Sequence, residues 1–150
     1  MRVLVVDDDP SVRGVVRVGL DRFDVVEADD GPGALAALRR APADVVLLDL
    51  MMPRMNGFEV LSAIRAEHGE SIAVLVLTGR AAELDHIAAY RLGADGYLVK
   101  PFDVDALCDA VEEASARSRA ERAKARGIEL AQAEFFQRLE QGFGPPARSG

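Results

Sequence analysis

The sequence predicts a doubly wound α/β domain, in which helices cover both faces of a five-stranded parallel sheet. Short apolar runs alternate five times with stretches of helical periodicity, the order expected of repeated strand–helix units. Most of these runs are apolar at every position, which is typical of strands buried on both faces. Strands that alternate with crossover helices pair in parallel, so one sheet with two helical layers is the expected architecture.

The first three strands are expected at 3–6, 24–28 and 45–48, with helices over 9–20, 32–40 and from 57 onward. The first helix can start at Asp9, because Asp caps helix N-termini and Pro10 fits the first turn. The second strand contains more polar residues and should be more exposed. The third strand ends abruptly on Asp49, and Pro53 and Gly57 punctuate the segment before the next helix.

The last two strands are expected at 73–77 and 96–99, with helices over 81–92 and from about 103. Five strands favour the flavodoxin-like order 2-1-3-4-5. The domain should therefore span 1–115. Residues 116–141 are expected to form a helical extension or linker, and 142–150 a flexible tail rich in Gly, Pro and Ser.

The segment after residue 115 carries two patterns. Residues 115–126 are polar on every side, so no face of them is expected to pack on the domain. We expect an extended fifth helix and a short terminal helix, with a solvated linker to a missing domain as an equally weighted alternative. Phe135, Phe136 and Leu139 are candidates for docking on a neighbour or on the domain. A solvated helix face is expected for the basic cluster, with an anionic partner as the alternative; its members are Arg117, Arg119, Arg122, Lys124 and Arg126.

Composition narrows the function. The 150 residues carry a net charge of −7, with the acidic excess before residue 115. Phosphate contacts dominate nucleic-acid affinity, so we expect no direct nucleic-acid binding; the charge suits a site for a divalent cation. The apolar run after Met1 is too short for a signal peptide or a membrane span, and we expect no membrane contact. The single cysteine, Cys108, excludes an internal disulfide, which favours a cytoplasmic location.

Reactive side-chain types follow four of the five strands: Asp7 and Asp8, Asp49, Thr78 and Lys100. Because parallel strands deliver their carboxyl ends to one rim, we expect these residues to meet there. Clustered carboxylates repel one another and attract a cation, and oxygen ligands without His or Cys select Mg²⁺. Mg²⁺ beside a free carboxylate and a lysine is an arrangement suited to phosphoryl transfer.

The ordered motifs are Asp7-Asp8, Asp49-Leu50-Met51-Met52-Pro53 with Asn56-Gly57, Thr78-Gly79, and Tyr97-Leu98-Val99-Lys100-Pro101. Over residues 1–115 this set closely resembles the receiver domain of two-component response regulators. The resemblance implies a phosphoacceptor signalling domain and not an enzyme with turnover. Asp49 would take a phosphoryl group from a phosphohistidine on a sensor histidine kinase or phosphotransfer protein, and lose it slowly by autodephosphorylation.

The resemblance also implies a ligand set for Mg²⁺. Asp8, Asp49 and the backbone carbonyl of Met51 would bind the ion directly, and Asp7 would hold it through water. Asp9 is a third acidic residue that the family pattern does not require. We interpret Asp9 as the N-cap of the first helix and not as a ligand.

The remaining implied roles concern the switch. Lys100 would pair with Asp49 and then with the phosphoryl group, and the Lys100–Pro101 peptide bond would be cis. Thr78 would move toward the phosphoryl group, and Tyr97 would turn inward and remodel the face of the fourth helix, fifth strand and fifth helix. An ordinary edge-strand aromatic is the alternative for Tyr97. Expected partners are a downstream protein target or a missing output domain, with a homodimer also considered.

Parts of the sequence are compatible with two other functions. Asp7-x-Asp9 resembles the nucleophile motif of haloacid-dehalogenase-type phosphatases, but the chain is short for that family and the motif leaves Asp49 unexplained. Turnover of a generic phosphate ester would favour the phosphatase. A structural interaction module that has lost phosphorylation is the third candidate, and the intact set of motifs argues against it.

Overall fold

The computed structural model describes residues 1–79 and 83–142, apart from the side chains of residues 83, 84 and 142. Within that part, the strands are β1 (Arg2–Val6), β2 (Asp24–Ala28), β3 (Val45–Asp49), β4 (Ala73–Thr78) and β5 (Gly96–Val99). The helices are α1 (Pro10–Gly19), α2 (Gly31–Arg40), α3 (Gly57–His68), α4 (Glu83–Arg91), α5 (Val104–Ala116) and α6 (Arg119–Gly142). The expected start of the fourth helix at Ala81, and the tail from 143, lie outside the described residues.

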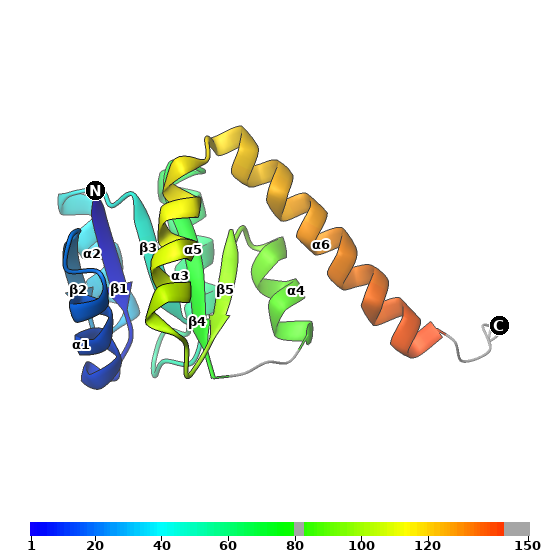
Figure 1. Cartoon of the computed structure of the whole chain (residues 1–150), viewed down its shortest axis with the longest axis horizontal. Coiled ribbons are helices and arrows are strands. Elements are labelled where there is room, and N and C mark those ends of the chain that lie inside the picture. The colour runs from blue at the N-terminus through cyan, green and yellow to red at the C-terminus, as the bar shows by residue number, and fades with distance from the viewer. Residues whose placement is uncertain (80–82, 143–150) are drawn as a thin grey trace.

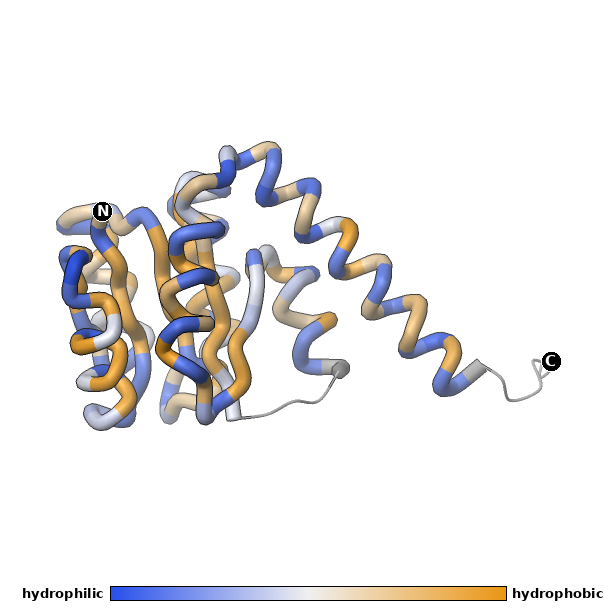
Figure 2. Tube along the Cα trace, viewed as in Figure 1, coloured by the Kyte–Doolittle hydropathy of each residue, from blue (hydrophilic) through white to orange (hydrophobic). Residues whose placement is uncertain are grey.

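The sheet is entirely parallel and has the order β2-β1-β3-β4-β5, which confirms the predicted flavodoxin-like topology. Figure 1 shows α1 and α5 on one face of the sheet and α2 and α3 on the other, with α4 beside β5. Every residue of β3 and β4 is buried, which explains their unbroken apolar runs. Figure 2 shows hydrophobic central strands and an α6 on which hydrophilic and hydrophobic residues alternate.

The helices start where the sequence places capping residues. The Asp9 carboxylate accepts a hydrogen bond from the Ser11 amide at 2.8 Å, with Pro10 in the first turn of α1. Asn56 and Glu59 form a reciprocal capping box at the start of α3. Asp9 is therefore the N-cap of α1, as predicted. These caps fix where each helix leaves the carboxyl-end rim of the sheet.

Gly57 is required by a close approach between backbone segments. A Cβ atom at this position would lie 2.4 Å from the carbonyl oxygen of Asp49 and 2.6 Å from the Cα of Leu50. The Gly57 amide donates to the Leu50 carbonyl at 3.1 Å. The Asn56-Gly57 pair thus holds the N-terminus of α3 directly against the end of β3, where Asp49 lies.

The structure corrects the prediction of an extended fifth helix and a short terminal one. The fifth helix ends at Ala116, Arg117 is extended (φ −85°, ψ 144°), and the terminal helix α6 is 24 residues long. Ser118 and Glu121 cap α6 reciprocally, with bonds of 2.7 and 3.1 Å. This capping box starts α6 directly after α5 has ended, so residues 119–142 are helical.

The structure also corrects the expectation that 115–126 has no packing face. Arg122 is 7% exposed and the side chain of Arg126 is 13% exposed. Arg126 donates to the carboxylates of Glu70 and Asp95, and Arg122 forms an ion pair with Asp95 at 3.6 Å. These polar residues can be buried because they are paired. Only part of the basic cluster is solvated; Arg119 and Lys124 are exposed. None of the described helices is long and apolar enough to cross a bilayer.

Candidate functional site: an acidic pocket at the rim of the sheet

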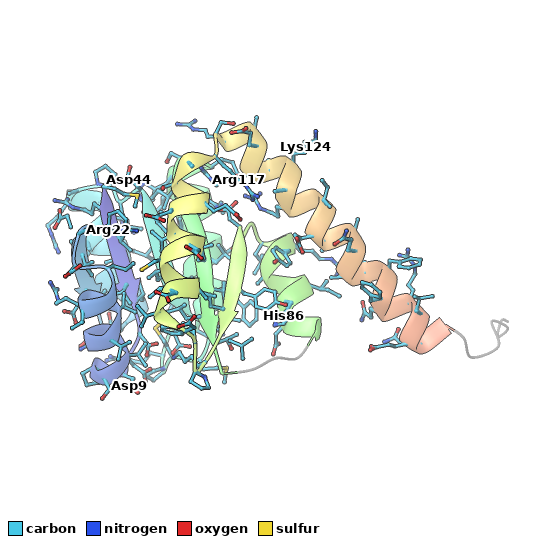
Figure 3. The ribbon with its side chains drawn as sticks, in the orientation of Figure 1. Asp9, Arg22, Asp44, His86, Arg117 and Lys124 are labelled. Atoms are coloured by element: carbon cyan, nitrogen blue, oxygen red, sulfur yellow. The ribbon has the colours of Figure 1, made fainter. Side chains whose placement is uncertain are left out.

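The structure brings the predicted residues together at the carboxyl ends of β1, β3, β4 and β5. Asp7, Asp8 and Asp49 each offer an oxygen, and these three atoms lie within 4.8 Å of one another. Asp7 and Asp49 are buried, whereas Asp8 is exposed. Lys100 reaches this cluster from the end of β5. In Figure 3 this rim is the lower edge of the sheet, where Asp9 is labelled.

Asp7 is fixed by two donors. Its Oδ1 accepts from the Asp9 amide at 2.9 Å, and its Oδ2 accepts from the Lys100 ammonium at 2.6 Å. The Lys100 ammonium lies 3.6 Å from Asp49, so its nearest partner in this state is Asp7 and not the expected Asp49. Although burial lowers the pKa of Lys100, the hydrogen bond that it donates to Asp7 and the charge of Asp49 raise this pKa overall. The lysine is therefore held as a cation between two carboxylates.

The surroundings of Asp49 disfavour its ionised form. Burial raises its pKa from 3.8 to about 6, and the charges of Asp7 and Asp8 act in the same direction. The Met51 amide, which donates to Asp49 Oδ1 at 3.0 Å, and the Lys100 charge act in the opposite direction. One lysine does not neutralise three clustered carboxylates. A bound cation would relieve the remaining repulsion.

The donor set fits a hard divalent cation. The clustered ligands are carboxylate oxygens, and no histidine or cysteine of the described part of the chain belongs to the group. His68 ends α3 and His86 lies in α4, while Cys108 in α5 donates its thiol to the Gly19 carbonyl at 3.3 Å. Cys108 thus packs between α5 and α1.

Thr78 and Tyr97 occupy different environments. Thr78 ends β4 and is fully buried at the rim. Tyr97 lies on the edge strand β5 and is 39% exposed, with its ring stacked on His86 at a centroid distance of 3.6 Å and edge-on to Tyr90 at 6.1 Å. The Lys100–Pro101 peptide bond is cis. Sequence reasoning did not find the stack, although His86 and Tyr90 are one helical turn apart.

Sequence reasoning also missed a charged network around Asp95, at the opposite end of β5. Asp95 is 4% exposed, and Arg65 of α3 donates to it at 3.0 Å. Arg65 also donates to the Gly93 and Ile72 carbonyls. A single arginine inside the apolar pattern of α3 was the available signal, because an arginine on a buried helix face needs partners.

The flavodoxin-like sheet thus places an acidic pocket and a lysine at its carboxyl-end rim, where ligands bind in folds of this class. The family model described as the response regulator receiver domain matches residues 3–112. The chain belongs to this family, and its role in two-component signal transduction follows. The match stops short of α6.

Curated relatives agree with this assignment. The chain is 42% identical over 103 residues to "DNA-binding response regulator MtrA" of Mycolicibacterium smegmatis, an alignment that covers 67% of the chain and 44% of the relative. It is 42% identical over 122 residues to "Response regulator MprA" of Mycobacterium leprae, covering 80% of the chain and 50% of the relative. The chain thus spans about half the length of these curated relatives.

Solved structures show the same fold. The chemotaxis protein CheY4 of Vibrio cholerae superposes with a TM-score of 0.72 at 34% identity, covering 75% of this chain and 97% of that one. The receiver domain of NtrX from Brucella abortus gives a TM-score of 0.73 at 31% identity, covering 77% and 99%. These neighbours correspond to the receiver part of the chain.

Proposed function

We propose that Asp49 accepts a phosphoryl group from a phosphohistidine on a sensor histidine kinase or phosphotransfer protein. The phosphorylated domain then controls a downstream protein or an output domain of a longer protein. The observation that supports this is the convergence of three carboxylates and one ammonium at a single rim. These are the groups that phosphoryl transfer to a carboxylate needs.

The oxygen donors fit Mg²⁺. In this proposal Asp8, Asp49 and the Met51 carbonyl hold the ion directly, and Asp7 holds it through water. When bound, Mg²⁺ supplies positive charge to the oxygens of the transferred phosphoryl group. The hydrogen bonds from Lys100 and the Asp9 amide leave Asp7 positioned for a supporting role rather than for attack.

The chemical step is an in-line displacement. An Asp49 carboxylate oxygen attacks phosphorus, the new O–P bond forms, and the P–N bond to the donor imidazole breaks, with the electron pair leaving on the imidazole nitrogen. Lys100 turns its ammonium from the carboxylates to the phosphoryl oxygens and neutralises them. Thr78 donates its hydroxyl to one of these oxygens. The products are an acyl phosphate and a free histidine.

The new group has enough interaction energy to switch the domain. It adds about −1.5 to −2 charge and one to three charge-assisted hydrogen bonds. At roughly 1.5–3 kcal/mol each, these bonds are comparable with the about 5.5 kcal/mol that reverses a 1:99 equilibrium. Thr78 moves toward the phosphoryl group, and Tyr97 turns inward and reshapes the face formed by α4, β5 and α5.

The downstream partner in this proposal is an output domain of the same, longer protein. MtrA is named as a DNA-binding regulator, and the matched chain is about half its length, which supports an output domain in a longer protein. The net charge of −7 argues against direct nucleic-acid binding by this chain. A second copy of the chain is the other partner considered. Light scattering with and without beryllofluoride would detect such a homodimer.

The test is intact mass spectrometry after incubation with a small phosphodonor and Mg²⁺. The wild-type chain should gain one phosphoryl group, and Asp49→Asn should gain none. Asp9→Asn is the matched control: Asn also caps helices, so this variant should still be phosphorylated. An adduct that persists in Asp49→Asn would place the acceptor elsewhere and contradict the proposal.

The phosphatase alternative places the nucleophile at Asp7. Both carboxylate oxygens of Asp7 already accept hydrogen bonds, and the side chain is fully buried. Asp9, the second residue of that motif, caps α1. Turnover of a generic phosphate ester by the wild-type chain would favour the phosphatase; a single self-phosphorylation supports the receiver.

A further inference from the structure

The C-terminal helix α6 is attached to the receiver through charged side chains. Arg122 and Arg126 lie one turn apart on α6, and both reach Asp95 at the start of β5. The Arg126 Nη2 to Asp95 Oδ1 distance is 2.8 Å, and the Arg122 Nε to Asp95 Oδ2 distance is 3.6 Å. Arg126 also donates to Glu70 at 2.7 Å, and Arg122 donates to the Glu70 carbonyl.

Asp95 links α6 to the core of the domain. Besides α6, it binds the Arg65 guanidinium of α3 and the Val74 amide of β4. Buried charges are tolerated only with partners, so this network fixes where the first half of α6 lies. Figure 3 shows Lys124 on the outer side of α6, away from this contact.

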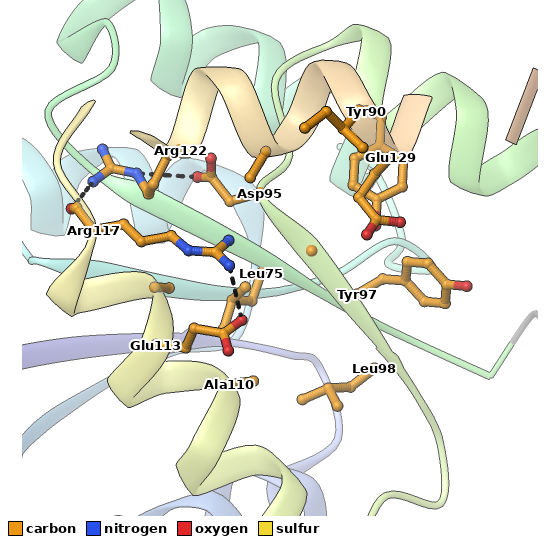
Figure 4. A pocket seen from close by; sticks show the side chains of 14 residues that line it. Leu75, Tyr90, Asp95, Tyr97, Leu98, Ala110, Glu113, Arg117, Arg122 and Glu129 are labelled. Carbon is orange, nitrogen blue, oxygen red and sulfur yellow. Dashed lines mark hydrogen bonds and ion pairs between the residues drawn. The ribbon is translucent and has the colours of Figure 1, made fainter. Parts of the chain in front are cut away.

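The rest of α6 covers the α4–β5 face without filling the space beneath it. α6 runs along α4, and Arg91 of α4 pairs with Glu134. A cavity of about 420 Å³ lies between β5, α5 and α6, as Figure 4 shows. A second cavity of about 200 Å³ lies under Phe136, which remains 57% exposed. The large apolar residues Ile128, Phe135 and Phe136 of α6 remain at least half exposed, so the charge network contributes much of the attachment of this helix.

Tyr97 lies on β5 between the surface that α6 covers and the rim of the sheet. It lines both cavities under α6 and stacks on His86 of α4. In Figure 4 its ring points from β5 toward the side of the molecule where α4 lies. An inward movement of Tyr97 would therefore remove part of the surface on which the second half of α6 packs.

We propose that α6 is a tethered inhibitory helix, which covers the α4–β5 face of the unphosphorylated protein and leaves it when Asp49 is phosphorylated. This inference rests on the proposed function. The inward turn of Tyr97 takes its ring away from His86 and opens the wall of both cavities. The second half of α6, which begins after the Arg122 and Arg126 pairs, then loses this packing surface and moves away, and the α4–β5 face becomes accessible to a partner.

Hydrogen exchange with mass spectrometry tests the release on the full chain. With Mg²⁺ and the phosphate mimic beryllofluoride, exchange over 129–142 should rise at least about tenfold, because a helical segment of this length is marginal in water once it is undocked. Asp49→Asn should show no rise. Protection of 50–56 reports that the mimic has bound. Protected 50–56 with unchanged α6 overturns this inference alone, whereas unchanged 50–56 in the wild type overturns the proposed function as well.

A matched pair of variants tests the attachment. The double variant Arg122→Ala/Arg126→Ala should raise α6 exchange at least about tenfold without the mimic, given the cost of breaking a buried charge network. Arg119→Ala/Lys124→Ala removes the same charge from exposed positions of α6 and should leave its exchange unchanged. Protected peptides from β3 and β4 show that each variant is folded. An α6 that stays protected without Arg122 and Arg126 contradicts the inference, and the wild-type comparison tests it even if a variant unfolds.

Discussion

Replacing Asp49 with Asn should stabilise the protein when no divalent cation is present. Burial and the nearby carboxylates raise the pKa of Asp49 to about 6, so the fold favours its protonated form. Above pH 6 the ionised carboxylate is therefore a destabilising group. Below its ordinary pKa of 3.8, the carboxyl is protonated in both the folded and the unfolded chain, and the destabilisation disappears.

The size of the effect follows from the pKa. A rise of about two units, at 1.36 kcal/mol per unit, corresponds to about 3 kcal/mol of destabilisation at neutral pH. Asn is neutral and nearly isosteric, and its side-chain oxygen can still accept from the Met51 amide. Lys100 loses one anionic neighbour in the variant but keeps its 2.6 Å contact with Asp7. We therefore expect a net gain of about 1–3 kcal/mol.

Urea unfolding in EDTA measures this difference. At pH 7.5 the unfolding midpoint of Asp49→Asn should lie above that of the wild type by roughly 1 M, for a typical dependence on urea. The difference should shrink as the pH falls from about 6 toward 3.8. Mg²⁺ should stabilise the wild type and not the variant, because only the wild type keeps the full ligand set. The control Asp9→Asn should stay near wild type.

A variant that is less stable than the wild type in EDTA would refute this reasoning. So would a difference that persists unchanged at acidic pH, since repulsion among ionised carboxylates would then not be its source.

The roles of Asp8, Gly57, Asp95 and Glu70 can each be tested by substitution. Asp8→Asn should fold normally but lose most of the thermal shift that Mg²⁺ causes in the wild type; an unchanged shift contradicts its role as a ligand. Gly57→Ala should cost about 1–3 kcal/mol in urea unfolding through overpacking, and a neutral effect would contradict the close approach. Asp95→Asn should cost about 3–5 kcal/mol, because it leaves buried guanidinium groups without their anion; a loss below 1 kcal/mol counts against the network. The hydrogen bond from Arg126 lowers the pKa of Glu70 from its ordinary value of 4.5. The Glu70–Arg126 pair therefore stabilises the folded protein fully above pH 4.5, and this stabilisation is lost as the pH falls through the lower pKa of Glu70 in the folded state. Exchange of α6 should therefore rise at acidic pH, and Glu70→Gln should remove this step.

The receiver part of the chain was predictable because its signals are local. The four-residue apolar run before Asp49 identifies a strand buried on both faces, and β3 is buried at every position. Once the strands are known to be parallel, their carboxyl ends must meet at one rim. The meeting of Asp49 with Lys100 follows from topology alone, although the two are far apart in the chain. The nearer contact of Lys100 with Asp7 depends on side-chain positions and was not predictable.

The packing of α6 was not predictable from periodicity. Arg126 binds Asp95 and Glu70, which precede it by 31 and 56 residues. A polar segment looks solvated in the sequence, because the pattern of a helix carries no information about a distant carboxylate. The apolar residue Phe135 near its end stays half exposed, whereas the arginines in its first half bind the domain.

The amino-acid sequence by itself determined the strands, the caps and the set of reactive residues at the rim, because each depends on neighbours within a few positions and on the handedness of the crossovers. Only the tertiary structure decided where α6 lies and which guanidinium meets which carboxylate. The physical reason is that an arginine can be buried only where an anion lies within reach, and the rest of the fold decides where that anion is placed.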